Sequence, residues 1–341
     1  MSTAVIKKSN VLHAFFCGGA ALNVGMSLFQ QKGLPKNEAD EGFADIKTTY
    51  IDTSKSNIKS YIGEDFYLIE GTSDAPIDGS GKVRATNYRA VSQAVPSILH
   101  KHKPGDLNVV IHSSGGGSGA VIGPVLVSEL LAQGKDVIVI QIGSTACEQE
   151  IRNTISTIQS YQGISEKRGK AVVSIYLENN KETPMIENDS RARVNTLLLA
   201  AVWSGRNQGL DSQDLDHFLN YDKVSKFAPA LTGLSIYSVG VEAEIAKGQA
   251  VSSMITLVRE GEDPTPDLLV GYHSFGTISD LASKAVKVPT PFHLMTVQGY
   301  FTGIVSRLQE KLSEAEEQYR VNPVHGLNMA SVKTQDDGMV L

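Results

Sequence analysis

Hydrophobic residues in the first half of the chain occur in short runs rich in β-branched and aromatic side chains, separated by longer stretches that suit helices. This alternation is typical of a parallel β-sheet with helices on both faces. Between two of these runs, residues 120–132 are apolar on most sides and end at a glycine, which predicts a buried helix within a β-α-β unit. The strands are expected at 11–16, 48–51, 66–69, 107–112, 137–142 and 171–176.

The pattern changes after Glu187, where polar side chains able to cap a helix precede an apolar stretch at 194–203. A helix that is apolar all round is buried on every side, so we expect a central helix that joins two domains. The next segment predicts a short helix from about Leu210 to Leu219, with Ser212 as its cap. Further strands are expected at 234–239, 254–258, 268–275 and 293–298, separated by proline-rich turns.

The last part of the chain contains one more amphipathic helix and then a tail. Apolar residues recur at helical spacing from Phe301 to Tyr319, which predicts a helix with one apolar stripe. Residues 336–341 join two acids to an apolar tip, as in a peptide that docks onto another protein. We therefore divide the chain into a first domain (1–186), a central connecting helix (187–208), a second domain (209–299) and a C-terminal helix with its tail (300–341).

Composition narrows the class of protein. Hydrophobic residues make up 41% and charged residues 20%, as in a folded globular chain. The net charge of −6 gives no reason to expect binding of nucleic acid or of an anionic membrane, and no apolar run approaches the roughly twenty residues of a spanning helix. Two distant cysteines exclude a disulfide framework and favour a reducing compartment. His13 interrupts the apolar run near the N-terminus, which favours a buried strand there over a secretion signal.

Two glycine-rich loops follow predicted strands. The first is the run from Gly18 to Gly25, and the second is formed by Gly115, Gly116, Gly117, Ser118 and Gly119. A glycine loop between a strand and a helix presents free backbone amides and the positive end of the helix dipole to one point, where phosphate binds well. Both loops would lie at the same edge of the sheet, which predicts a nucleotide site. No P-loop signature is present, and the first loop lacks the G-x-G-x-x-G spacing of dinucleotide-binding folds.

Other chemistries fit less well. Ser118 follows a strand and His112 is near it, but the G-x-S-x-G elbow of a serine hydrolase is broken by Ala120. The only histidine cluster, at 100–103, alternates with lysine and is more typical of a solvated turn than of ligands, so we predict no structural metal. Any Mg²⁺ would be held mainly by nucleotide phosphates and water.

The ordered set of motifs resembles the tubulin/FtsZ superfamily, which has a glycine loop after the first strand, a triple-glycine loop with Ser/Thr-Gly after the fourth, and then a long central helix. Within it, residues 114–124 and the ending at 336–341 are most similar to the phage-encoded tubulin branch of the PhuZ type. The resemblance implies an α/β fold with a parallel-sheet nucleotide-binding domain, a long central helix, a smaller α+β second domain, and a C-terminal helix and acidic tail.

The resemblance also implies roles for individual residues. Gly18, Gly19 and Asn23 would lie in the first nucleotide loop, Asp52 and Thr53 in the second, and Gly71, Thr72 and Ser73 near the γ-phosphate, with Arg84 adding charge there. Residues 115–119 would surround the α- and β-phosphates, Glu148 and Arg152 would touch ribose and phosphate, and Asn179 and Asp189 would read guanine. A carboxylate accepts hydrogen bonds from the N1–H and 2-amino groups that guanine has and adenine lacks, which is why GTP is expected.

Simpler interpretations of three of these residues stay open. Glu148 and Arg152 are also spaced as an exposed i,i+4 ion pair, and Asp189 is also placed to cap the central helix.

Ala21 stands where the superfamily commonly has glycine, and Val121 replaces the last glycine of the fuller bacterial signature. Both departures favour the phage branch.

Asp211 and Asp214 match the spacing of two acids in the catalytic loop of the superfamily. They follow the central helix, and some eighteen residues at ~1.5 Å each would carry them roughly 27 Å from the nucleotide of their own copy. In the family such acids complete the site of the next subunit and polarise the attacking water, so that head-to-tail stacking builds filaments. From spacing alone, the two acids are more typical of a helix N-terminus than of a catalytic loop.

The resemblance thus implies a phage tubulin-like GTPase that binds GTP and GDP, with Mg²⁺ held mainly by the nucleotide. It would polymerise with copies of itself in the host cytoplasm, dock residues 336–341 on a neighbouring copy, and build a spindle that positions phage DNA, without direct contact with nucleic acid or membrane. Two alternatives are a non-polymerising nucleotide- or phosphoester-utilising α/β enzyme and a nucleotide-binding regulator that does not hydrolyse.

Overall fold

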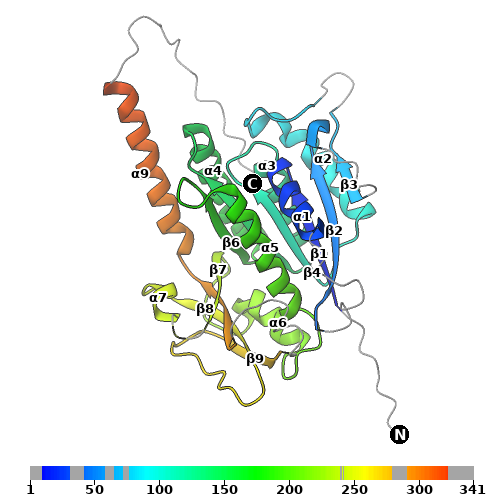
Figure 1. Cartoon of the computed structure of the whole chain (residues 1–341), viewed down its shortest axis with the longest axis vertical. Helices are drawn as coiled ribbons and strands as arrows, with labels where there is room; N and C mark the ends of the chain where they lie inside the picture. The colour runs from blue at the N-terminus through cyan, green and yellow to red at the C-terminus, as the bar shows by residue number, and fades with distance from the viewer. Residues whose placement is uncertain are drawn as a thin grey trace, which may run out of the picture.

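The computed structural model of the chain describes residues 10–30, 42–57, 65–71, 77–238, 240, 242–278 and 290–321. Within these residues the strands form one sheet in the order β3-β2-β1-β4-β5-β6-β7-β10-β8-β9 (Figure 1). The strands in chain order are β1 (Val11–Cys17), β2 (Asp45–Asp52), β3 (Phe66–Leu68), β4 (Leu107–Ser113), β5 (Val137–Ser144), β6 (Val172–Asn179), β7 (Leu231–Ser238), β8 (Val251–Val258), β9 (His273–Thr277) and β10 (Phe292–Val297).

The sheet is parallel from β3 to β6 and mixed beyond it. β7 joins β6 in parallel over residues 172–174 and 231–233, whereas β10 is antiparallel to both β7 and β8. The first half therefore has the predicted parallel α/β organisation, which confirms the predicted fold class. The second half continues the same sheet as a smaller, mostly antiparallel region.

Helices cover both faces of the sheet, because successive residues of each strand point to opposite sides. On one face Leu12 and Phe16 of β1 pack with α1 and α5, while on the other Phe15 packs with α2, α3, α4 and α9. The longer helices are α1 (Gly19–Gln30), α2 (Tyr88–Lys101), α3 (Gly119–Ala132), α4 (Glu148–Arg168), α5 (Met185–Val202), α6 (Ser212–Leu219) and α9 (Tyr300–Val321), with a short α7 (Glu242–Ala246).

Helix α5 is the predicted central helix and runs through the middle of the molecule to α6 at the opposite end (Figure 1). Two local predictions are wrong. The cap of α6 is Asp211 instead of Ser212, because the Asp211 side chain accepts hydrogen bonds from two amides of the first turn. The strand expected at 268–275 forms only at its end, as β9, and Leu269 in its first part is 94% exposed.

In the described part of the chain, no helix is both long enough and apolar enough to cross a membrane.

Candidate functional site

A cavity of about 480 Å³ lies at the carboxyl ends of the parallel strands, where both glycine loops meet. This is the edge at which open α/β sheets bind their ligands. Four strand ends, with the residues that follow three of them, contribute to its lining: β1 (17–20), β2 (Asp52, Ser54 and Asn57), β4 (Ser113 and 116–119) and β5 (142–144). The rest of the lining consists of residues 79, 80 and 82 ahead of α2, and of Glu150, Asn179 and Met185.

The two glycine loops touch each other through their backbones. Gly18 has φ +83°, a conformation that side chains disfavour, and a Cβ placed on it would lie 2.8 Å from the Gly119 nitrogen. A Cβ on Gly119 would lie 2.8 Å from the Cys17 carbonyl oxygen. The Gly18 amide also donates to the Ile51 carbonyl at 2.8 Å. Glycine is therefore required at both positions to bring the loops together.

The second glycine loop leads into α3 with its amides available to a ligand. The first amides of a helix have no intrahelical acceptor, and within the described residues no group accepts from the amides of Gly117, Ser118 or Gly119. The Ser118 hydroxyl is fixed by a 2.7 Å hydrogen bond with Thr53 Oγ1. Adjacent amides at the positive end of a helix dipole bind an anion such as phosphate.

Asp52 and Thr53 shape the segment that faces this loop. Asp52 is 1% exposed and accepts hydrogen bonds from the Thr53 amide at 2.7 Å and from Asn57 Nδ2 at 2.6 Å. Burial raises the pKa of Asp52, although these donors oppose the rise. A carboxylate committed in this way fixes the loop geometry.

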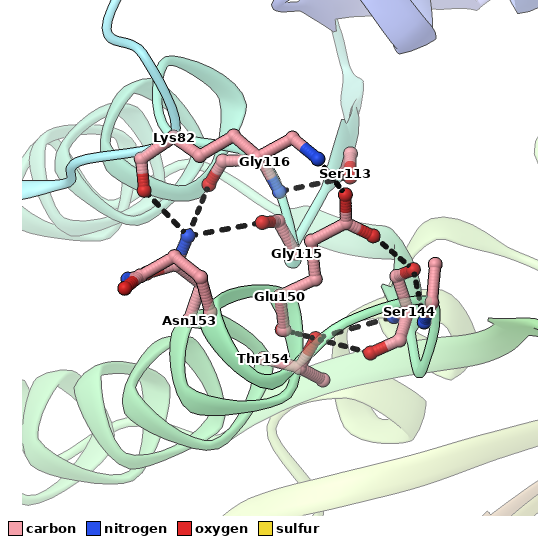
Figure 2. Close-up of polar contacts among 10 residues, drawn as sticks. Lys82, Ser113, Gly115, Gly116, Ser144, Glu150, Asn153 and Thr154 are labelled. Atoms are coloured by element: carbon pink, nitrogen blue, oxygen red, sulfur yellow. Dashed lines mark hydrogen bonds and ion pairs between the residues drawn. The ribbon is translucent and has the colours of Figure 1, made fainter. Parts of the chain in front are cut away.

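An ion pair crosses the cavity beside the glycine loop (Figure 2). Lys82 Nζ donates to Glu150 Oε1 at 2.5 Å, and the Ser144 hydroxyl donates to Glu150 Oε2. Burial tends to raise the pKa of Glu150, but hydrogen bonds from Lys82 and Ser144 outweigh it and lower the pKa. The hydrogen bond to Glu150 raises the pKa of Lys82, so both groups are charged at neutral pH.

Asn153 ties this ion pair to the backbone of the glycine loop. Its Nδ2 donates to the carbonyl oxygens of Lys82 at 2.9 Å, Gly115 at 3.0 Å and Gly116 at 3.4 Å (Figure 2). Three chain segments distant in sequence are thus held together by one buried amide.

Some predicted nucleotide residues do not reach the cavity. Arg84 is 3% exposed and lies beneath α3, where its Nη2 donates to Ser160 Oγ at 3.0 Å and Ala120 O at 3.4 Å, so it supplies no charge at the cavity. Asn23 is exposed on α1 outside the lining, and Gly71 also lies outside it. Thr72 and Ser73 lie outside the described residues.

Glu148 and Arg152 form the simple i,i+4 pair that the sequence left open. Arg152 Nε donates to Glu148 Oε1 at 2.9 Å, and Arg152 Nη2 donates to Glu316 of α9 at 2.5 Å. Glu148 lines a separate hollow between α4, the end of β6 and α9, and neither residue lines the glycine-loop cavity. Arg152 thus links α4 to α9, and the contact of both residues with ribose and phosphate stays a prediction.

Of the two predicted base-reading residues, Asn179 lines the cavity and Asp189 lies outside its lining. Asn179 ends β6 and lines the cavity, and Asp189 lies one turn along α5 from the cavity residue Met185. The N-cap of α5 is Pro184, so Asp189 is not the helix cap that the sequence left open. Burial raises the pKa of Asp189 to about 6. Its Oδ1 is buried without a hydrogen-bond partner among the described residues, which leaves an acceptor for a ligand.

Asp211 and Asp214 form the capping box of α6, at the far end of α5 from the cavity. Asp211 Oδ1 accepts from the amides of Gln213 at 2.7 Å and Asp214 at 3.0 Å, and Asp214 Oδ2 accepts from the Asp211 amide at 2.9 Å. The amides of Asp214 and Gln213 lower the pKa of Asp211. Tyr272 donates to Asp214 Oδ1 at 2.8 Å, and its pKa is raised to about 12 by burial and by this hydrogen bond.

The sequence interpretation missed Lys82, Glu150, Asn153 and Asn57. Two signals for them were present in the sequence. Lys82 ends a Gly-Ser-Gly-Lys segment, and Asn57 follows Asp52 within the same loop. Glu150 lies two residues beyond Glu148 and therefore on a different face of α4, the face that turns toward the glycine loop.

This site and fold define a class. A parallel sheet with two glycine loops at its carboxyl edge, a central helix leading away from them, and a mixed second half is the tubulin/FtsZ architecture. The protofilament structure of TubZ from bacteriophage PhiKZ superimposes with a TM-score of 0.77 at 23% identity, covering 95% of this chain and 96% of that one. The structure of the phage tubulin PhuZ with GDP gives 0.77 at 20% identity, covering 97% and 99%.

Sequence comparison narrows the class further. The chain is 28% identical over 310 residues to a phage tubulin-like protein of Pseudomonas phage PhiPA3, covering 90% of this chain and 91% of the relative. No family model matches the chain. In fold and in sequence the chain is similar to phage tubulin-like proteins, as its motifs predict.

Proposed function

We propose that the chain is a GTPase that polymerises head to tail, with each active site completed by Asp211 and Asp214 of the next copy. The observation that carries the proposal is the separation of these acids from the cavity. Met185, at the start of α5, lines the cavity, and the acids follow its other end. The 18 residues of α5 span about 27 Å at ~1.5 Å per residue, too far for the acids to act within one copy.

Nucleotide binding is supported by the glycine-loop amides and by the orphan acceptor of Asp189. The amides suit the α- and β-phosphates. The Asp189 carboxylate, with Asn179, suits the N1–H and 2-amino groups of guanine. The PhuZ structure with GDP is of the same fold. Among the described lining residues only Asp52 and Glu150 carry carboxylates, so Mg²⁺ would be bound mainly by phosphate oxygens and water.

Polymerisation is supported by exposed apolar side chains at both ends of the molecule. Ile186 is 78% exposed and Val83 is 41% exposed, next to the cavity residues Met185 and Lys82. Leu269 is 94% exposed and Phe275 is 48% exposed on the segment that packs beside Asp211 and Asp214. Two different apolar ends suit a heterologous contact, and such contacts build filaments when they do not close into rings. The structures of related proteins include a protofilament.

Light scattering by the purified protein tests this function. We expect scattering to rise with GTP above a critical concentration and to stay low with ATP or without nucleotide. A non-polymerising α/β enzyme or a nucleotide-binding regulator would scatter in none of these conditions.

The tail 336–341 lies outside the described residues, and we propose that it docks on a neighbouring copy. Its deletion is expected to abolish the GTP-dependent scattering while the thermal unfolding midpoint stays unchanged; normal scattering would exclude the tail contact.

In cells, we propose that such filaments form in the cytoplasm of a phage-infected host and position phage DNA. The proposal follows from the phage tubulin-like relative and needs neither nucleic acid nor membrane contact by this chain. Fluorescence microscopy of the labelled protein during infection tests it, and diffuse fluorescence throughout infection would count against it.

The raised pKa of Asp189 predicts that lowering the pH has opposite effects on the stability of the fold and on GTP affinity. Because burial raises this pKa to about 6, the nucleotide-free fold gains stability as pH falls through 6. Guanine binding needs the carboxylate, so GTP affinity is expected to fall over the same range. Asp189→Asn is expected to remove both dependences and to weaken GTP binding about tenfold or more at pH 7.5, the effect of one charge-assisted hydrogen bond. Thermal melts and GTP titrations at pH 5.5 and 7.5 measure both; a pH-independent wild type would refute the assignment.

A further inference from the structure

The strongest unexplained feature near the site is a carboxylate in a phosphate-binding cavity. Glu150 lines the same cavity as the amides of Gly117 and Gly119, and its side chain is only 15% exposed. A Cβ added to Gly115 would lie 3.3 Å from Glu150 Cβ, which places the acid directly against the glycine loop. An ionised carboxylate at that position repels phosphate unless a positive charge compensates it.

Lys82 provides that positive charge from a strained backbone position. Its φ is +66°, in the left-handed region that strains a residue with a side chain. The two glycines of the same segment, Gly79 and Gly81, also have positive φ values, of +79° and +54°. A strained lysine persists only where surrounding contacts hold it, here the Glu150 ion pair and the Asn153 amide.

The Lys82 ammonium is also placed to reach a ligand. Its side chain is 55% exposed and lines the cavity, and Ser80, two residues earlier, presses on the glycine loop so closely that a Cβ on Gly117 would lie 2.0 Å from Ser80 Oγ. An ammonium has three donors, and one of them is directed to Glu150 Oε1. Phosphate oxygens at the amides of residues 117–119 would therefore lie beside a cation that is already in the cavity.

We propose that Lys82 is a phosphate-binding residue whose ammonium is shared between Glu150 and the phosphates of the bound nucleotide, and that Glu150 opposes phosphate binding whenever Lys82 is absent. The inference deepens the proposed function, since it names the charges that govern phosphate binding at the same site. The roles of Lys82 and Glu150 concern the phosphate groups alone and do not depend on the identity of the base.

The test is a double-mutant cycle measured by calorimetric titration with GTP and with inorganic tripolyphosphate. Lys82→Met is expected to weaken both ligands about tenfold, the effect of one charge-assisted hydrogen bond. Glu150→Gln is expected to bind both at least as tightly as wild type, and the double variant is expected to recover most of the lost affinity. Lys223→Met is the matched control, because Lys223 has a similarly exposed side chain (52%) and also pairs with an acid, Asp216, outside the cavity.

Lys82→Gly separates binding from folding. Glycine accepts a φ of +66° without strain, so this variant is expected to keep the wild-type thermal midpoint, or exceed it, while binding tripolyphosphate as weakly as Lys82→Met. Loss of affinity on Glu150→Gln would overturn the proposal, because it would assign Glu150 to a Mg²⁺ ion or to loop support. Equal binding by Lys82→Met and Lys223→Met would overturn it as well.

The two proposals fail in different ways. If wild type binds tripolyphosphate but not GTP, the proposed GTPase function fails and the Lys82 cycle still decides the phosphate-binding role. If wild type binds GTP and the cycle shows no coupling between positions 82 and 150, only the present inference fails. If wild type binds neither ligand, both fail.

Discussion

Asp211→Asn is expected to leave filaments that assemble with GTP but turn over very slowly. Asparagine caps a helix about as well as aspartate, so α6 keeps its N-terminus while the charge is lost. If Asp211 polarises the water that attacks the γ-phosphate in the next copy, phosphate release should fall roughly a hundredfold, the lower range for loss of such a group. Phosphate release and light scattering, followed in the same sample, measure the two effects separately.

Two controls support this result. Asp222→Asn removes an exposed acid just beyond α6 and should leave turnover unchanged. Asp214→Asn should resemble Asp211→Asn, because Asp214 shares the capping box and is oriented by Tyr272. Unchanged phosphate release in both variants would reduce the two acids to their capping role.

A mixing experiment tests whether the active centre is shared between copies. Asp211→Asn retains its own nucleotide but lacks the acid, while a glycine-loop variant lacks nucleotide but retains Asp211. Each alone should be inactive, and their mixture should recover part of the phosphate release, because Asp211 of one copy meets the nucleotide of the other. Failure to recover, with copolymers visible by microscopy, would argue for a site contained within one copy.

Gly117→Ala is expected to weaken nucleotide binding strongly with little loss of fold. A Cβ at this position would lie 2.0 Å from Ser80 Oγ and 2.6 Å from Ser80 Cβ, so either the glycine loop or the Ser80 segment must move. Both line the cavity, and GTP affinity should fall about a hundredfold or more, as when a rigid site is displaced by about 1 Å. Titration with a fluorescent guanine nucleotide measures the loss.

A second substitution, at Ser80, is expected to restore part of the affinity lost in Gly117→Ala. Ser80→Gly combined with Gly117→Ala removes both clashing atoms and leaves the Lys82 carbonyl carbon, at 3.1 Å, as the next neighbour. Part of the affinity should return. Gly303→Ala, on an exposed turn of α9 where a Cβ meets nothing within 4 Å, is the control and should bind normally. Normal binding by Gly117→Ala itself would mean that the loop is not the phosphate site.

Much of the fold could be predicted because local sequence determines it. The alternation of residues in β1 divides Leu12 and Phe15 between two cores, and the apolar stretch within α5 shows that this helix is buried. Gly18 and Gly119 could be identified because no other residue allows that conformation or that backbone contact. These features depend on neighbours along the chain and on a few strict steric limits.

The rest depends on contacts between distant segments. Arg84 follows a glycine-rich segment and is a reasonable phosphate ligand by sequence. In the structure its guanidinium lies in the core, where it donates a hydrogen bond to Ser160 of α4, 76 residues later. Lys82 and Glu150 are 68 residues apart and meet because α4 passes under the glycine loop. Helical spacing places Glu148 and Glu150 on different faces of α4, but it does not say which of these faces meets the glycine loop.

The two halves of the sheet are joined by a short ladder between β6 and β7. β6 and β7 share only residues 172–174 and 231–233, whereas β5 and β6 pair from Ile138 to Ser144. A rotation of one half against the other would break the fewest ladder hydrogen bonds along this line. If copies stack head to tail as proposed, a rotation about this short β6–β7 junction would move the α6 end sideways across the nucleotide of the adjacent copy, and a bend within each copy would set how tightly a stacked pair engages.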